Sequence, residues 1–236
     1  MSDLIMQLAG VIQRDIDSLK EVSQNVANAN TPGYRASRGF NVLAPASMAV
    51  GASQGLDAIE SRTSLDLQGG ALQQTGTATD LALTGDAWFA VQDGRRTLLT
   101  RDGRFHVDSA GYLVNASGLR VLGDGGPLQV DNGVFKVDSR GEVLLDDQPV
   151  ARLQLVRVSD PTRLTALGAG LYQLAGRMAP AQDYVVHQGV QERSNVALGN
   201  DMVKIMEVSR HVESLQRALS AYDGMLDTGI NQLGKD

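Results

Sequence analysis

The sequence predicts a mainly β central domain, antiparallel and rich in hairpins, with N- and C-terminal α-helices that form a coiled-coil-like bundle. Three observations predict it: helical apolar periodicity at the start of the chain, the same periodicity at its end, and short runs of Val, Leu and Phe between them, broken by glycine every eight to twelve residues. We expect an axial helix over 1–30, an extended connector over 31–66, the β-rich domain over 67–190 and a second axial helix over 191–236.

The N-terminal helix carries a single apolar stripe, in which each step is three or four residues. Its members are Ile5, Leu8, Ile12, Ile16, Leu19, Val22 and Val26. Charged residues lie mainly off the stripe, so the helix is amphipathic and one face of it needs a partner.

The segment "NVANANTPGYRAS" (25–37) ends this helix firmly. Asn28 and Asn30 tolerate a left-handed C-cap, and Thr31 is disfavoured in the α region because a proline follows it. Pro32 and Gly33 fit the centre of a type II turn. Taken alone, the segment is an ordinary helix end.

The connector and the β-rich domain differ in residue composition and in periodicity. Residues 36–66 lack clear periodicity and are rich in Ala, Ser and Gly. In the β-rich domain, "FHVDSAGYLV" and "FKVDSRGEVL" align without a gap at an offset of 30 residues. Asp at the first position and Gly at the fourth favour a tight turn between two strands, which assigns turns to Asp108, Gly111, Asp138 and Gly141. Two copies do not support a solenoid or propeller.

The C-terminal helix contains a heptad-like stripe with alternating steps of three and four residues, as in coiled coils. Its members are Ile205, Val208, Val212, Leu215, Leu219, Tyr222 and Leu226. Charges of alternating sign run along the outer faces from Asp201 to Arg217. A helix over 200–232 would span about 50 Å.

Both terminal stripes must be buried, and neither belongs to the β domain. We therefore expect the terminal helices to pair with each other and with copies from neighbouring subunits, with Pro32 and Gly33 turning the chain out to the β domain. The alternative is an isolated two-helix stalk that closes one monomer.

Composition argues against several classes of partner. The net charge of -6 and the scattered Lys and Arg provide no basic face for nucleic acid. The chain has no cysteine, which excludes disulfides and thiolate chemistry. Acidic Asp3, and charges at Arg14 and Asp15, do not fit a cleaved secretory signal. Apolar runs are far shorter than the roughly 20 residues of a membrane span, so no membrane insertion is expected.

Residues that carry chemistry do not converge in the sequence. His106, His187 and His211 lie far apart and lack carboxylates at metal-ligand spacing. "GDGGP" (123–127) lacks the Lys-Ser or Lys-Thr of a phosphate loop and is interpreted as a turn. No nucleophile has a base beside it. We expect no catalytic residues, cofactor, metal or small-molecule substrate.

Four segments resemble those of flagellar axial proteins, and they occur in that family's order. "NVANANTPGYRAS", including Tyr34, resembles the family's Asn-rich N-terminal motif. "GALQQTGTATDLALTGDAWFAVQ" (70–92) and the following "LTRDGRFHVDSAGYLVNASGLRVLGDGGPLQV" (99–130) are similar to its Asp-Leu-Ala and Thr-Arg-Asp-Gly segments. "QGVQERSNVALGNDMVKIMEVSRHVESLQRALSAYDGMLDTGINQLG" resembles its C-terminal Ser-Asn-Val segment and helix.

Within that family the chain is most similar to the flagellar basal-body rod proteins of the proximal rod. The resemblance implies a structural subunit of a torque-transmitting drive shaft in the periplasmic part of the rod. It implies other proximal and distal rod subunits and the flagellar export apparatus as partners, with a rod cap as a further candidate.

Two alternatives remain open. One is a distal rod or hook-type axial subunit, which the short length argues against. The other is a β-scaffold protein that binds or hydrolyses cell-wall glycan, with helical oligomerisation ends. Aromatic residues make up only 4% of the chain and Trp88 is its only tryptophan, which argues against a sugar site. Trp88 departs from the family's usual phenylalanine, and its bulk is expected to alter a contact surface.

Overall fold

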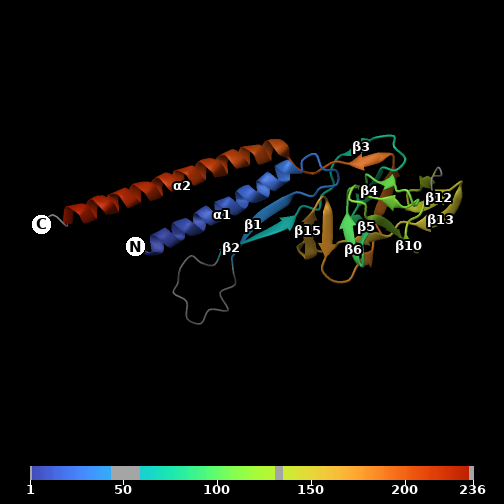
Figure 1. Cartoon of the computed structure of the whole chain (residues 1–236), viewed down its shortest axis with the longest axis horizontal. Helices are drawn as coiled ribbons and strands as arrows, with labels where there is room; N and C mark the ends of the chain where they lie inside the picture. Colours follow the sequence, from blue (N-terminus) through green and yellow to red (C-terminus); the bar gives the residue numbers. More distant parts are fainter. Residues whose placement is uncertain (1, 44–58, 131–134, 234–236) are drawn as a thin grey trace. The chain divides into compact units, whose positions relative to one another are not determined.

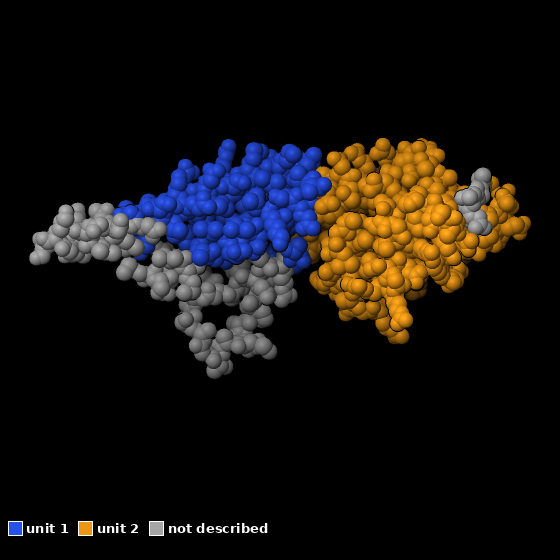
Figure 2. All heavy atoms as spheres, viewed as in Figure 1, with its two compact units in different colours: residues 1–27, 39–63, 197–236 blue, residues 28–38, 64–196 orange. Residues whose placement is uncertain are grey.

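The computed structural model describes residues 2–43, 59–130 and 135–233. The chain divides into two compact units (Figure 2). Unit 1 comprises residues 1–27, 39–63 and 197–236, and unit 2 comprises residues 28–38 and 64–196. Each unit therefore draws on segments that are distant in the sequence.

Unit 1 contains the two long helices, α1 (Ser2–Ala27) and α2 (Leu198–Leu233). They pack against each other and run side by side (Figure 1). At 36 residues, α2 is about 54 Å long. Both helices are free of proline, so the backbone hydrogen bonds continue along their whole length.

Two strands lie in the segment for which the sequence predicted an extended connector. β1 (Ser37–Leu43) and β2 (Ile59–Leu65) form a two-stranded sheet. Glu21 of α1 accepts a hydrogen bond from the Gly39 N–H at 2.6 Å, which ties β1 to the helix. Residues 44–58 lie outside the described residues. The strands have few large apolar residues, and this explains their weak sequence signal.

Unit 2 is built of antiparallel strands. Its main sheet has ten strands, in the order β15-β16-β6-β5-β9-β8-β7, with β10 paired to β9 and β14 paired to both β5 and β17. These strands are β5 (Ala87–Asp93), β6 (Arg96–Thr100), β7 (His106–Val107), β8 (Leu113–Val114), β9 (Arg120–Gly123), β10 (Gly126–Pro127), β14 (Leu155–Arg157), β15 (Leu164–Gly168), β16 (Leu171–Leu174) and β17 (Ala179–Pro180).

Three smaller sheets complete unit 2. One contains β11 (Phe135–Val137), β12 (Glu142–Leu145) and β13 (Gln148–Arg152). In the other two, β4 (Leu81–Gly85) pairs with β18 (Tyr184–Gln188), and β3 (Leu72–Gln74) pairs with β19 (Val190–Glu192). The last strands of the unit thus return beside the first ones. A short 3-10 helix, η1 (Pro161–Arg163), precedes β15 and is capped by Asp160.

The core of unit 2 lies on both faces of β5. Phe89 and Val91 belong to one apolar cluster and Trp88 and Ala90 to the other. Phe89 meets Phe105 edge-to-face, with ring centroids 5.2 Å apart. Because β5 is buried on both sides, its apolar residues run without alternation.

The turns assigned from the sequence repeat connect strands in unit 2. Asp108 Oδ1 accepts hydrogen bonds from the N–H groups of Ala110 and Tyr112, both at 2.9 Å. Asp138 Oδ1 accepts in the same way from Arg140 at 2.9 Å and Glu142 at 2.7 Å. The N–H groups of Gly111 and Gly141 close the turns onto the carbonyls of these aspartates.

A third turn of the same design lies between them and was not predicted. Asn115 Oδ1 accepts from the N–H groups of Ser117 at 3.0 Å and Leu119 at 2.8 Å. Its sequence, "NASG", places Asn where the other two turns have Asp. The amide oxygen can make the same local bonds as a carboxylate oxygen.

The predicted fold class is confirmed: a mainly antiparallel β structure with a helix at each end of the chain. The coiled-coil geometry of the helices and the four segment boundaries drawn from the sequence stay predictions.

Candidate assembly site

The apolar stripe of α2 coincides with the half-buried side of the helix. Ile205, Val208, Val212, Leu215, Leu219 and Tyr222 are all half-buried, whereas most residues between them are exposed. The side chain of Leu226 lies outside the described residues. A heptad-like spacing keeps these six residues on one side of the helix.

The stripe of α1 is more deeply covered near its C-terminal end. Leu8, Ile12, Leu19 and Val26 are half-buried and Val22 is 2% exposed. Ile16 is 44% exposed and so departs from the pattern. The side chain of Ile5 lies outside the described residues. Within one chain, the packing of α1 against α2 therefore uses much of both stripes.

A polar contact also joins the two helices. The imidazole Nδ1 of His211 lies 2.7 Å from Asp15 Oδ2. Asp15 and His211 lie near opposite ends of the chain, so no local sequence pattern relates them. Apolar residues that remain at least two-fifths exposed gather at the start of α2: Leu198, Met202, Val203 and Met206.

In unit 2, the segment after α1 makes the turn expected at Pro32 and Gly33. The Thr31 N–H donates to the Asn28 carbonyl at 3.0 Å, and the Tyr34 N–H donates to the Thr31 carbonyl at 3.2 Å. Gly33 has φ 66°. A Cβ atom on Gly33 would lie 2.2 Å from the Arg101 carbonyl carbon, so only glycine fits here without backbone movement.

The segment before α2 runs beside this turn. The Gly33 N–H donates to the Glu192 carbonyl at 2.8 Å, and the Asn195 N–H donates to the Tyr34 carbonyl at 3.3 Å. The Ala36 N–H donates to Asn195 Oδ1 at 2.7 Å. We call the contact between residues 33–36 and 192–195 the chain junction.

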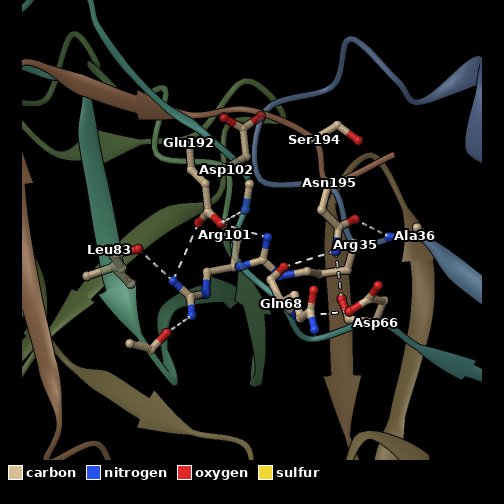
Figure 3. Close-up of polar contacts among 12 residues, drawn as sticks. Arg35, Ala36, Asp66, Gln68, Leu83, Arg101, Asp102, Glu192, Ser194 and Asn195 are labelled. Carbon is tan, nitrogen blue, oxygen red and sulfur yellow. Dashed lines mark hydrogen bonds and ion pairs between the residues drawn. The ribbon is translucent and has the colours of Figure 1, made fainter. Parts of the chain in front are cut away.

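Asn195 also binds the segment that follows β2. Its Nδ2 donates to the carbonyls of Asp66 at 3.0 Å and Gln68 at 2.9 Å (Figure 3). The Asn195 side chain thus connects its own backbone segment with the segments that contain Ala36 and Asp66.

Glu192 is the centre of a buried charge cluster at the junction (Figure 3). Its Oε1 lies 2.7 Å from Arg35 Nη1 and accepts the Gly70 N–H at 2.9 Å. Its Oε2 lies 3.5 Å from Arg101 Nη1. The side chains of Arg35 and Glu192 are 0% and 1% exposed. A Cβ on Gly70 would lie 1.8 Å from the Arg193 carbonyl oxygen, so the backbone approaches closely here.

Arg101 also binds the backbone of β4. Its Nη1 donates to the Leu83 carbonyl at 2.9 Å, and its Nη2 donates to the Gly85 carbonyl. Burial lowers the pKa of Arg101 to about 10, and Glu192 opposes this shift. The guanidinium is therefore held by three acceptors, in a place that disfavours its charge.

Aromatic rings complete the cluster. The Cζ atoms of Arg35 and Arg101 lie 5.9 Å and 5.6 Å from the centroid of Trp88. Tyr172 meets Trp88 edge-to-face at 5.1 Å, and its hydroxyl accepts the Arg35 N–H at 3.2 Å. Burial raises the pKa of Tyr172, while the Arg35 N–H opposes the shift.

The expectation that Trp88 alters a contact surface is wrong. Trp88 is 2% exposed and packs inside unit 2, because both faces of β5 are covered. A buried indole ring is also no platform for a sugar. Within residues 2–43, 59–130 and 135–233, no group of three or more His, Cys, Asp or Glu has the arrangement of a metal site. No helix among those residues is both long and apolar enough to cross a membrane.

Sequence reasoning missed the residues of the charge cluster. Arg35, Arg101 and Glu192 lie far apart in the sequence, and no local pattern marks these charged residues for burial. One signal was present: Arg35, Arg101 and Asn195 each lie in one of the segments quoted above for their family resemblance. These segments, far apart in the chain, meet at the junction.

Two family models match the chain. Residues 82–145 match the model described as "Flagellar hook protein FlgE/F/G D1 domain". Residues 187–233 match the one described as "Flagellar basal body rod FlgEFG protein C-terminal". The first covers much of the β-rich part of unit 2, and the second runs from the end of β18 through α2.

Similar curated proteins extend over nearly the whole chain. The flagellar basal-body rod protein FlgF of Caulobacter vibrioides is 31% identical over 95% of this chain and 94% of its own length. FlgF of Mesorhizobium japonicum is 32% identical over 94% and 93%. The basal-body rod protein FlgG of Bacillus subtilis is 26% identical over 90% and 92%. The chain therefore belongs to the flagellar basal-body rod protein family.

Proposed function

We propose that the protein is a structural subunit of the bacterial flagellar basal-body rod, of the FlgF type, without catalytic activity. The observation that carries the proposal is the end-to-end similarity to proteins named as rod subunits, 31% over 95% of the chain. It includes both helices as well as the β unit, so the similarity is not confined to one shared module.

The arrangement of the helices in unit 1 supports a mechanical role for the protein. Unit 1 offers two amphipathic helices, and the exposed apolar residues at the start of α2 remain available to other chains. Neighbouring subunits are expected to complete the burial of the helices, including the exposed Ile16, and so to build a self-associating shaft. Contacts of this kind between different faces propagate helically and do not close as a dimer.

The proposed location is the periplasmic part of the basal body, in the proximal rod. Its partners there are proximal and distal rod subunits, and the flagellar export apparatus delivers the chain. A rod cap is a further candidate partner. The subunit transmits torque through its contacts and needs no cofactor.

The glycan-binding or hydrolysing alternative has no support. The one tryptophan is buried against two arginines and Tyr172, so its ring is not accessible to a sugar. The distal-rod or hook-type alternative also lacks support.

A clean deletion of this chain tests the proposal. Basal bodies isolated from the deletion strain should contain a truncated rod that lacks its distal segment, as seen by electron microscopy, and the cells should not swim. A normal rod together with normal swimming would refute the assignment.

Helix variants test the mode of assembly. Leu215→Asp or Leu219→Asp places a charge on the half-buried side of α2 and should abolish assembly while Trp88 still reports a folded unit 2. Ser220→Asp adds the same charge at an exposed position next to Leu219 and should assemble normally. Assembly of Leu219→Asp at the level of Ser220→Asp would contradict the proposed use of the stripe.

A further inference from the structure

The contact between Asp15 and His211 places a charged group at the packing surface of α1 and α2. The Asp15 side chain is 18% exposed and lies on the half-buried side of α1. Its half-buried neighbours one turn away on α1 are all uncharged: Val11, Ile12, Ser18 and Leu19. A carboxylate in this place needs a partner from α2, because a buried charge without a partner is costly.

The carboxylate oxygen that faces α2 has no hydrogen-bond donor. Asp15 Oδ2 is buried and accepts no hydrogen bond from any described residue. His211 Nδ1 lies 2.7 Å away, but the two atoms form an ion pair without the alignment of a hydrogen bond. The attraction is therefore electrostatic, and it exists only while the imidazole carries a second proton.

The helices carry few other charges close to this pair. Glu207 lies one turn from His211 on α2 and favours the same protonated imidazole. Arg14 and Arg210 each precede a member of the pair in the chain, but both arginines are exposed. Within the part of the chain that the structure describes, neither of them forms an ion pair with Asp15.

The strand tied to α1 does not supply a cation either. Glu21 binds the Gly39 N–H of β1 and lies more than one turn from Asp15 along α1. The one charged residue of β1 is Arg38, which is 58% exposed and pairs with Asp66 at 3.1 Å. His211 is thus the cation that the described residues place against Asp15.

We propose that one proton bound by His211 tightens the pairing of α1 and α2 within a single chain. Between about pH 5 and 8 a carboxylate is ordinarily charged, whereas an imidazole gains its proton as the pH falls. The proton binds the paired helices better than the separated ones, so pairing is most stable near the acidic end of this range and weakens as the pH rises. This inference does not depend on the rod assignment.

A double-mutant cycle on a verified monomer of the full chain tests the proposal. Thermal unfolding is followed by the helical circular dichroism signal, which reports unit 1 because the long helices α1 and α2 both belong to it. Asp15→Asn and His211→Gln are measured singly and together at about pH 5.5 and about pH 8. At the lower pH the unfolding temperature of the double variant should lie about 2 to 6 °C above the value expected from the two single effects. At the higher pH the single effects should add.

Asp17→Asn is the matched control. Asp17 is exposed on the same helix and accepts a hydrogen bond from Gln13 Nε2 at 3.2 Å, so its effect and that of His211→Gln should add at both pH values. No coupling of Asp15 with His211 at the lower pH, or equal coupling at both, would overturn the proposal. If Asp15→Asn does not fold, the native chain and His211→Gln decide. A difference in their unfolding temperatures that shrinks toward the higher pH supports the proposal, and a constant difference overturns it.

Discussion

Glu192→Gln should destabilise unit 2 far more than its small change in shape suggests. The glutamine oxygen can still accept the Gly70 N–H, which donates to Oε1 at 2.9 Å in the native protein. Its NH2 group would then face Arg101 Nη1, so that a donor meets a donor at the 3.5 Å contact now made by Oε2. Arg35 and Arg101 would both remain buried without the carboxylate.

Removal of one partner from a buried ion pair costs about 3 to 5 kcal/mol. For a unit of this size, each kcal/mol lowers the unfolding temperature by about 2 to 4 °C, so we expect a decrease of about 6 to 20 °C. The total stability of a domain is only about 5 to 15 kcal/mol, which makes this a large share. Trp88 is the only tryptophan and lies in the cluster, so its emission reports unit 2 without a label.

Asp147→Asn is the matched control. Asp147 and Lys136 are also 2.7 Å apart, but their side chains are 76% and 63% exposed. Water replaces this surface pair at little cost, so the unfolding temperature should not change measurably. A decrease in Glu192→Gln as small as that in Asp147→Asn would refute the reasoning that burial makes the Glu192 carboxylate essential.

Three further outcomes are expected. Gly33→Ala should destabilise unit 2 by more than Gly94→Ala in urea unfolding. Both glycines have positive φ, but only a Cβ at Gly33 would meet backbone, 2.2 Å from the Arg101 carbonyl carbon. Equal losses of stability would show that the close approach at Gly33 does not require glycine. Burial holds the pKa of Tyr172 above the ordinary 10.0, so its stabilising effect is complete below that pH and is lost as the pH rises through the folded-state pKa. The pKa of Arg101 is lowered to about 10, so this residue changes the stability with the opposite sign in the same pH range. The effect of Tyr172 is therefore taken as the difference in pH dependence of stability between the native chain and Tyr172→Phe. Phenolate absorbance of Tyr172 that develops fully before unit 2 unfolds would contradict the prediction. In a verified monomer, amide exchange of residues 205–222 should be faster than that of β5, because neighbouring chains complete the burial of α2, and equal protection would argue for the isolated two-helix stalk.

Local features were predictable from the sequence because local chemistry fixes them. The helices follow from apolar residues at steps of three and four, and the turns at Asp108 and Asp138 follow from side-chain bonds to N–H groups two and four residues ahead. The turn at Asn115 uses the same rule and was overlooked because a single copy with Asn does not stand out.

The position of Trp88 was predictable in principle. Ala87–Val91 is an uninterrupted apolar run, which is typical of a strand covered on both faces. The prediction of a contact surface relied instead on the departure of Trp88 from the family's phenylalanine. The strands β1 and β2 had no comparable signal, since their apolar residues are few.

The chain junction lay beyond single-sequence reasoning. Ala36 and Asn195 are 159 positions apart, and no periodicity relates residues at that distance. Arg35, Arg101 and Glu192 belong to residue types that usually lie at the surface. They are buried here because the backbone segments that carry them come together in the fold. Their partners become visible once the topology is known.

The chain junction determines how unit 2 responds when its two ends are pulled. Residues 33 and 34 bond to residues 192 and 195, so the two segments run in the same direction. Tension applied in opposite directions at residues 28 and 196 therefore slides one segment along the other, and the bonds of the junction resist together instead of opening one after another. Residues 64–191 of unit 2 lie between these two segments in the chain and outside the path of the force. The β sheets can thus stay unstrained while the ends of the unit carry tension.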